Sequence, residues 1–140
     1  MWLMRFILKI NYLRRYKKIG LDSYLFKRGI TAKGKILIGL EKESHKRHIE
    51  VGYWRKSWIL HEQFMSYDVS GDVDLNCKDI PLSKKDLKDM LDWIFKRLKL
   101  PFKTHEEYDK EDLINANEII TKLLKETDFK NEQIVYYAWW

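Results

Sequence analysis

Chemically active side chains concentrate in one stretch of this 140-residue sequence, VGYWRKSWILHEQF at residues 51–64. It contains two tryptophans, a tyrosine, an adjacent arginine and lysine, a histidine and a glutamate. Aromatic rings stack on nucleobases, and arginine binds phosphate through two parallel hydrogen bonds. The stretch therefore predicts a binding site for a small anionic ligand with an aromatic base, formed by Tyr53, Trp54, Arg55, Lys56 and His61.

Three residues elsewhere are weaker additions to this predicted ligand site. Tyr24 and Lys27 lie in GLDSYLFKR at residues 20–28, and Tyr108 lies in the EYD sequence at 107–109. Lys27 and the neighbouring Arg28 are further candidates for holding a phosphate. The alternative to a site is pure packing, because a Tyr-Trp pair at the junction of a strand and a helix is often a core plug. In that case Arg55 only pairs with a nearby glutamate.

Catalysis is the less favoured interpretation of the same residues. His61 is a candidate general base, with Glu62, Asp68 or Cys77 as helpers. The sequence has no Gly-rich phosphate loop, no nucleophile elbow and no paired-histidine metal helix. A single histidine on a partly apolar helix is more often a structural residue. We therefore expect a protein that binds rather than catalyses and that needs no cofactor.

Two patterns resemble metal sites without completing one. The two histidines of SHKRH are three residues apart but have no carboxylate or cysteine partners at ligand spacing. Asp72, Asp74 and Asn76 are similar to the opening of a calcium loop. Position six of that loop is Cys77 where glycine is needed, and position twelve is Ser83 where glutamate is needed. A surface loop without a metal is therefore predicted.

Composition indicates a folded protein with an uneven charge distribution. Hydrophobic residues make up 45% of the chain and charged residues 34%, which is typical of a globular domain. The single cysteine forms no internal disulfide, so a reducing cytoplasmic compartment is expected. The formal charge of +6 lies entirely in residues 1–19, and residues 20–140 are neutral. Nucleic-acid binding is therefore not expected except through the basic N-terminal extension.

Residues 1–19 form a basic, amphipathic extension ahead of a single domain at 20–140. Its apolar residues fall at helical spacing, so the segment could lie on an anionic membrane. Its charges interrupt both the ~20 apolar residues that a transmembrane helix needs and the apolar core of a signal peptide. There are three alternatives for this segment. It docks on the domain as a helix, it forms a strand of the sheet, or it is an accessory tail added by an upstream start.

The elements that position these residues follow from hydrophobic periodicity. Strands are expected at 20–28, 35–40, 48–53, 77–82 and 134–140. Helices are expected in the central stretch, from Ser83 to about Lys99, and from about Asp109. In the central helix, Trp54, Trp58 and His61 would share one side. Strands gathered early and late with helices between predict a single α+β domain, a small and mostly antiparallel sheet packed against about three helices.

The C-terminal sequence IVYYAWW supports a second function. Tyrosine and tryptophan dominate binding energy at protein interfaces. Tyr136, Tyr137, Trp139 and Trp140 are therefore candidate anchors for a host protein or for a second copy of the chain. In this alternative the protein is an inhibitor or adaptor, and exposure of the last two tryptophans would favour it.

Five segments in order form a recognisable pattern: GLDSYLFKR, VGYWRKSWILHEQF, LSKKDLKDML, EYD and the terminal YYAWW, which together span about residues 20–140. This pattern resembles a family of small uncharacterised proteins found mostly in bacteriophages and prophages. The family's central pattern is Tyr-Trp-Arg-Lys-x-x-x-Ile-His-x-Trp-Phe. This chain departs from it at Trp58-Ile59-Leu60, where the family has Asn-x-Ile, and at Gln63, where it has Trp. A Gly- and Phe-rich loop before the Tyr-Asp is also missing.

The resemblance implies a phage-type accessory protein, without a settled activity to transfer. Small phage proteins are often counter-defence factors. Sequestering a host nucleotide signal would require affinity and no turnover, which agrees with the lack of a catalytic signature.

Overall fold

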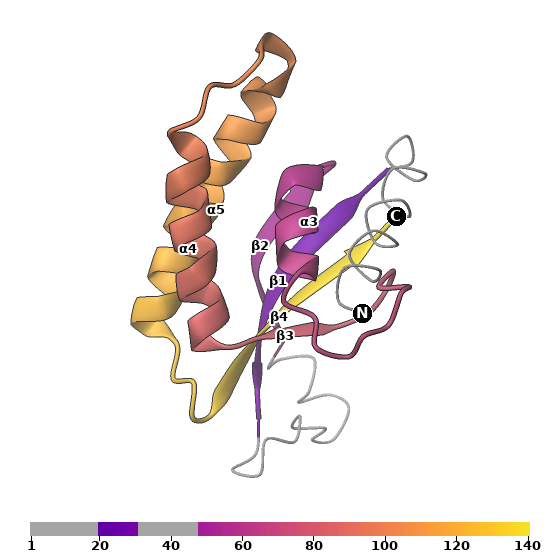
Figure 1. Ribbon diagram of the computed structural model, residues 1–140. Helices are drawn as coiled ribbons and strands as arrows, with labels where there is room; N and C mark the ends of the chain where they lie inside the picture. Colours follow the sequence, from indigo (N-terminus) through magenta and orange to yellow (C-terminus); the bar gives the residue numbers. More distant parts are fainter. Residues whose placement is uncertain (1–19, 31–47) are drawn as a thin grey trace.

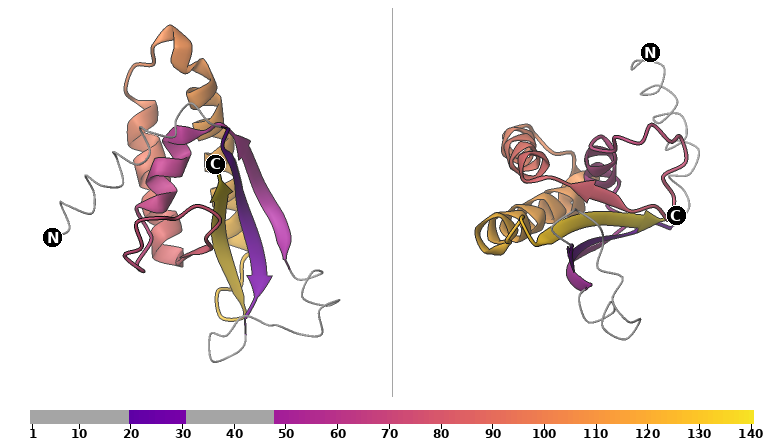
Figure 2. Two further views of the ribbon diagram at one scale, coloured as in Figure 1. Left: turned by 90° about the vertical axis from the view of Figure 1, so that its right-hand side faces the viewer. Right: turned by 90° about the horizontal axis from the view of Figure 1, so that it is seen from below.

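The computed structural model describes residues 20–30 and 48–140 as one antiparallel sheet with helices packed on one side (Figures 1 and 2). The strands are β1 (Asp22–Gly29), β2 (Ile49–Arg55), β3 (Ile80–Leu82) and β4 (Glu132–Trp139). They are ordered β2-β1-β4-β3 across the sheet. The predicted α+β fold is confirmed. The predicted extension at 1–19 and the predicted strand at 35–40 lie outside the described residues.

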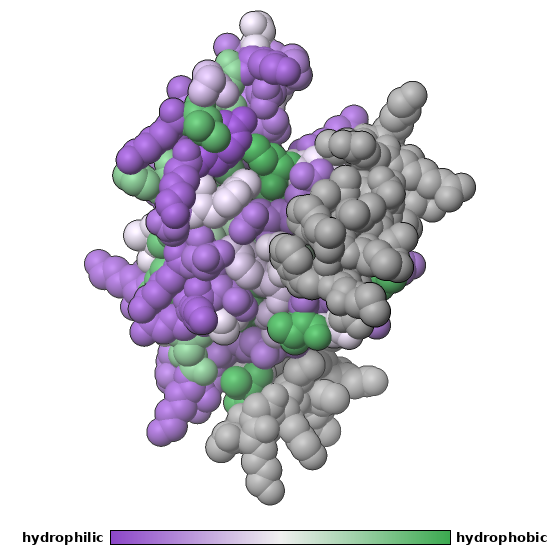
Figure 3. All heavy atoms as spheres, in the orientation of Figure 1, coloured by the Kyte–Doolittle hydropathy of each residue, from purple (hydrophilic) through white to green (hydrophobic). Residues whose placement is uncertain are grey.

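Three α-helices cover one face of the sheet within the described ranges: α3 (Trp58–Met65), α4 (Lys84–Leu98) and α5 (Glu107–Glu126). A capping box begins α4, because the Ser83 side chain accepts from the backbone N–H of Asp86 and the Asp86 carboxylate accepts from that of Ser83. Helices α4 and α5 form a hairpin that extends beyond the sheet in Figure 1. The surface over this hairpin is mostly hydrophilic (Figure 3). None of the helices in the described ranges is both long and apolar enough for a membrane span.

The central stretch contains more strand than its spacing predicts. Val51–Arg55 belongs to β2, and the helix begins only at Trp58, so the prediction that Trp54 lies on a helix is wrong. Pairing of β2 with β1 overrides the helical spacing, with Trp54 opposite Ser23. A turn then separates strand from helix, because Lys56 has a φ of 55° and its N–H donates to the carbonyl of Leu21 over 2.6 Å.

Strand alternation gives the sheet two aromatic surfaces. The helix-covered face carries the core residues of the strands, including Leu25, Trp54, Ile134 and Tyr136, all of which are buried. The opposite face, called the aromatic face below, carries Tyr24, Phe26, Tyr53, Tyr137 and Trp139. Among the described residues no helix covers the aromatic face (Figure 2).

Candidate functional site

A row of three tyrosines crosses the aromatic face. Tyr53 of β2 and Tyr137 of β4 are each directly opposite Tyr24 of β1. The ring centroids of Tyr24 and Tyr53 are 5.0 Å apart, and those of Tyr24 and Phe26 are 5.6 Å apart with the rings nearly parallel. The Tyr53 hydroxyl donates to Asp22 over 2.5 Å, and this bond raises the pKa of Tyr53. The rings of β1 and β2 therefore contact one another, and Tyr137 extends the row of tyrosines onto β4.

Part of this surface is hollowed into a pocket of about 470 Å³. This volume is in the range of small-ligand sites. Strands β1 and β4 supply most of the wall, and the loop before β3 supplies Asp79. The lining residues are Tyr24, Phe26, Arg28, His48, Asp79, Val135, Tyr137 and Trp139. Most of the wall is therefore aromatic or apolar, with a few polar groups that can orient a ligand.

Arg28 is the fixed cation of this aromatic-face pocket. The residue is only 6% exposed, and its guanidinium donates from Nε to Gln133 and from Nη1 to Asp79, both over 2.9 Å. Burying an unpaired charge is unfavourable, so the Asp79 carboxylate stabilises Arg28 in this position. Asp79 itself stays half-exposed. Because two different side chains hold the guanidinium, its plane is oriented before any ligand arrives.

The residues predicted from the central stretch do not form one site. Tyr53 and Arg55 lie on the aromatic face with Tyr24, because alternate strand residues share a face. Trp54 points the other way and is 3% exposed. Its indole packs on Phe64 and donates to the Asn115 side chain over 3.0 Å. Trp54 is thus the core plug of the packing alternative, whereas its neighbours on both sides face solvent.

His61 is also a core residue. It is 1% exposed, its Nδ1 lies 2.6 Å from the Tyr136 hydroxyl, and its ring contacts Trp58 and Trp140. Burial lowers the pKa of His61 to about 3, so the imidazole is neutral at physiological pH. Its Nε2 has no hydrogen-bond partner in the described part of the chain. A ligand on the aromatic face has no access to this imidazole, because the sheet lies between them.

Lys56 lies in a separate groove of about 340 Å³ at the start of α3. The groove is lined by Lys56, Trp58, Ile59, Glu62, Glu106 and Asp109. Three carboxylates line the groove with one ammonium group, and the carboxylate of Glu106 also pairs with Arg97 over 3.3 Å. The groove keeps an excess of negative charge, which disfavours an anionic ligand. Lys56 belongs to neither the core nor the aromatic face.

The remaining two predicted residues lie away from the aromatic-face pocket. Lys27 extends to the α5 side of β1, where its Nζ is 3.9 Å from a Glu132 oxygen. On this side Lys27 lines a groove together with Lys122 and Glu126 of α5. Tyr108, in the first turn of α5, is 79% exposed. Neither residue is among those that line the pocket with Tyr24.

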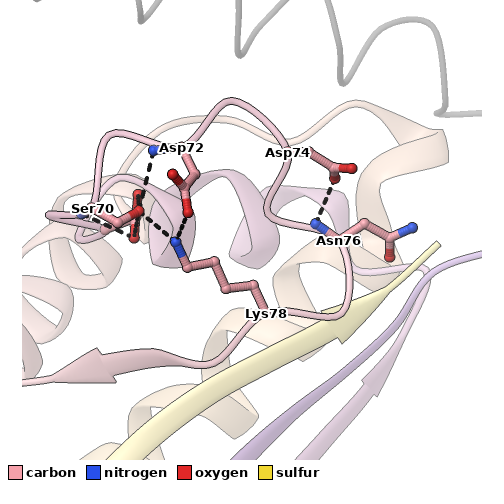
Figure 4. A network of polar contacts seen from close by, with 6 residues as sticks. Ser70, Asp72, Asp74, Asn76 and Lys78 are labelled. Atoms are coloured by element: carbon pink, nitrogen blue, oxygen red, sulfur yellow. Dashed lines mark hydrogen bonds and ion pairs between the residues drawn. The ribbon is translucent and has the colours of Figure 1, made fainter.

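The loop that resembles a calcium site contains a lysine among its carboxylates. In Figure 4 the Lys78 ammonium lies against Asp72 and the Ser70 hydroxyl. Asp74 accepts from the backbone N–H of Asn76 over 3.0 Å. Within the described ranges there is no group of three or more histidine, cysteine or acidic side chains that could hold a metal ion.

The same loop fixes the C-terminal residue. The Asn76 side chain donates to the Trp140 carbonyl over 2.9 Å and accepts from the Trp140 N–H over 3.0 Å. Trp140 is consequently half-buried against the core, whereas Trp139 is 48% exposed on the aromatic face. The two terminal tryptophans therefore have different surroundings.

The sequence pattern does not identify several residues of the aromatic-face pocket. Phe26, Asp79 and Val135 were not in the predicted site, and Arg28 entered it only as an alternative to Lys27. The available signal was the alternation of GLDSYLFKR, which places Tyr24, Phe26 and Arg28 on one face of a strand. The residues that line the pocket are far apart in the sequence, from Tyr24 to Trp139. The order of the strands in the sheet brings them together.

Comparisons of the chain with protein-family models, with curated proteins and with solved structures found no match.

Proposed function

We propose that the protein is a non-catalytic binding module that holds a small, anionic, nucleotide-like ligand in the aromatic-face pocket. The observation that carries the proposal is the combination of ring surfaces with a guanidinium in one pocket of about 470 Å³. Stacking on an aromatic side chain contributes ~1–3 kcal/mol per base. A prearranged arginine adds directional hydrogen bonds to an anionic or carbonyl oxygen.

Charge favours this pocket over the groove at Lys56. Arg28 lines the pocket, and Arg55 projects from the same face next to Asp22. The groove at Lys56 instead has three carboxylates and one ammonium. The negative charge of the groove therefore disfavours a phosphate there, whereas the aromatic face has one arginine for each of its two carboxylates, Asp22 and Asp79.

Binding without turnover agrees with the position of His61. The candidate base of the central stretch is buried on the helix side of the sheet, so it has no part in chemistry on the aromatic face. Sequestration of a host nucleotide signal needs only affinity, and it fits the resemblance to phage accessory proteins. We therefore propose a counter-defence role in the host cytoplasm.

Calorimetric titration tests the proposal. The purified protein is titrated with mononucleotides, cyclic dinucleotides and ADP-ribose, as wild type, Tyr24→Ala and Lys56→Ala. We expect one ligand to bind, to lose at least tenfold in affinity with Tyr24→Ala, to be unaffected by Lys56→Ala, and to be recovered unchanged. Absence of heat with the whole panel, or loss of binding only in Lys56→Ala, would contradict the proposal.

A protein partner is the second candidate function. It is favoured by the exposed rings of the aromatic face, since Tyr53 and Trp139 are 45% and 48% exposed. Tryptophan and tyrosine are the usual anchors of an interface. If this face binds a second copy, sedimentation of the wild type will show a concentration-dependent dimer that Trp139→Ala abolishes. A monomer at all concentrations would exclude the homodimer.

A further inference from the structure

The polar end of the aromatic-face pocket places a hydrogen-bond donor beside an acceptor. Nη1 of Arg28 and Oδ2 of Asp79 are 2.9 Å apart, and both residues line the pocket. Nη2 of Arg28 and Oδ1 of Asp79 take part in none of the hydrogen bonds among residues 20–30 and 48–140. Arginine only donates and an ionised carboxylate only accepts. A ligand edge that fits this pair needs an acceptor next to donors.

Guanine has such an edge. Its O6 accepts, and the adjacent N1–H and 2-amino group donate side by side, so a carboxylate binds both donors while an arginine binds O6. Adenine has the reverse order on the same edge, with an amino group where guanine has O6 and an acceptor where guanine has N1–H. Adenine therefore places its acceptor nitrogen against the carboxylate, which is unfavourable.

We propose that the aromatic-face pocket is specific for guanine, with Asp79 accepting from N1–H and the 2-amino group and Arg28 donating to O6. This inference rests on the proposed nucleotide-binding function and names the base. The base stacks on the rings beside the pair, which are those of Tyr24, Phe26 and Tyr137. Arg28 is 6% exposed, so a base that offers no acceptor to its Nη2 loses affinity.

Four mononucleotides that differ only at the base test the assignment. GMP, IMP, XMP and AMP are titrated up to millimolar concentration, with intrinsic tryptophan fluorescence as the signal. IMP lacks only the 2-amino group, so one hydrogen bond to a charged acceptor is lost and binding weakens by about tenfold. AMP is expected to bind more weakly than IMP.

A single substitution tests the geometry through a gain of affinity. In Asp79→Asn the side-chain amide has one acceptor and one donor, which match N1–H and the 2-carbonyl oxygen of xanthine. We expect GMP to weaken by at least tenfold and XMP to become the preferred ligand of the four. Such a gain also shows that the variant is folded. Asp72→Asn, whose carboxylate contacts Lys78 in the same loop, is the matched control and keeps the wild-type order.

The two proposals fail separately. If none of the four mononucleotides and no cyclic dinucleotide binds, the nucleotide-binding function is overturned together with the guanine assignment. If AMP binds the wild type as tightly as GMP, or if Asp79→Asn keeps the wild-type order, guanine recognition is overturned and nucleotide binding stands.

Discussion

The two faces of the sheet differ although the same strands supply aromatic residues to both. Tyr53 is 45% exposed and its neighbour Trp54 is 3% exposed, because successive strand residues point to opposite faces. Tyr136 and Tyr137 divide in the same way. The comparison teaches that strand alternation separates the buried aromatic residues of this chain from the exposed ones. One residue of each aromatic pair builds the core, and its neighbour forms a surface.

Polar groups differ between the faces as well. On the helix-covered face the Trp54 indole and the His61 ring bond to Asn115 and Tyr136 inside the protein. On the aromatic face the Arg28 and Asp79 pair lines a pocket of about 470 Å³. The polar groups of the core thus bond to other core residues, whereas those of the aromatic face bond to one another at the wall of a pocket.

The largest effect is expected from removing the aromatic ring at position 54. Trp54→Ala should lower the free energy of unfolding by about 3–5 kcal/mol, because it deletes a buried indole and leaves a cavity. Tyr53→Ala removes an exposed ring and should change stability by less than about 1 kcal/mol. Urea denaturation of both variants measures the difference. Similar losses in the two variants would show that the faces are not distinct.

Acid should destabilise the folded protein through His61, which is buried on the helix-covered face. Its pKa is about 3 in the folded protein and 6.5 for the free side chain, so below pH 6.5 the unfolded chain binds a proton that the folded chain does not. Stability is therefore complete above pH 6.5 and decreases as the pH falls toward 3. Between pH 6.5 and 4.5 we expect a loss of roughly 2–3 kcal/mol.

The His61→Gln variant provides the control for this acid effect. It lacks the titrating imidazole, so its free energy of unfolding should depend much less on pH between 6.5 and 4.5. Denaturation curves at several pH values measure both proteins. An equally steep dependence in the variant would assign the acid effect to other groups.

Gly52 tests how closely the helix-covered face is packed. A Cβ at this position would lie 2.8 Å from the Trp54 ring and 3.5 Å from the Leu25 Cβ. Gly52→Ala should therefore displace the indole and cost about 1–3 kcal/mol of stability. Gly20→Ala is the matched control, since a Cβ there has nothing within 4 Å. Equal melting temperatures for the two variants would contradict close packing at Trp54.

The smallest effect is expected from two adjacent hydroxyl groups. Tyr136→Phe removes the partner of a buried His61 nitrogen and should cost about 1–2 kcal/mol. Tyr137→Phe keeps the ring on the aromatic face and should be within ±0.5 kcal/mol of the wild type. Thermal denaturation compares them. A greater loss in Tyr137→Phe would reverse the assignment of the two faces.

Much of the fold follows from local sequence signals. The apolar spacing after Ser83 and its capping pair predict α4, and GLDSYLFKR and IVYYAWW predict β1 and β4 close to their observed bounds. The conformation of the central stretch is harder to predict, because Trp54, Trp58 and His61 have helical spacing although Trp54 belongs to a strand. Its conformation is determined by pairing with β1, which is a tertiary interaction.

The candidate site was only partly predictable for the same reason. Tyr24 and Tyr53 were identified by residue type, but their meeting with Tyr137 depends on strand order. Asp79 reaches Arg28 from a loop 51 positions later in the chain. Local periodicity gives the face on which a residue lies, but it does not give the neighbouring strand.

The most direct test of the central claim, that the aromatic face is the binding surface, is a ¹H–¹⁵N correlation spectrum of the indole N–H groups. The chain has six tryptophans, which Trp→Phe variants assign. Saturating GMP should shift the Trp139 signal at the pocket and leave those of Trp54 in the core and Trp58 at the Lys56 groove in place. A shift of Trp58 with an unchanged Trp139 would contradict the account.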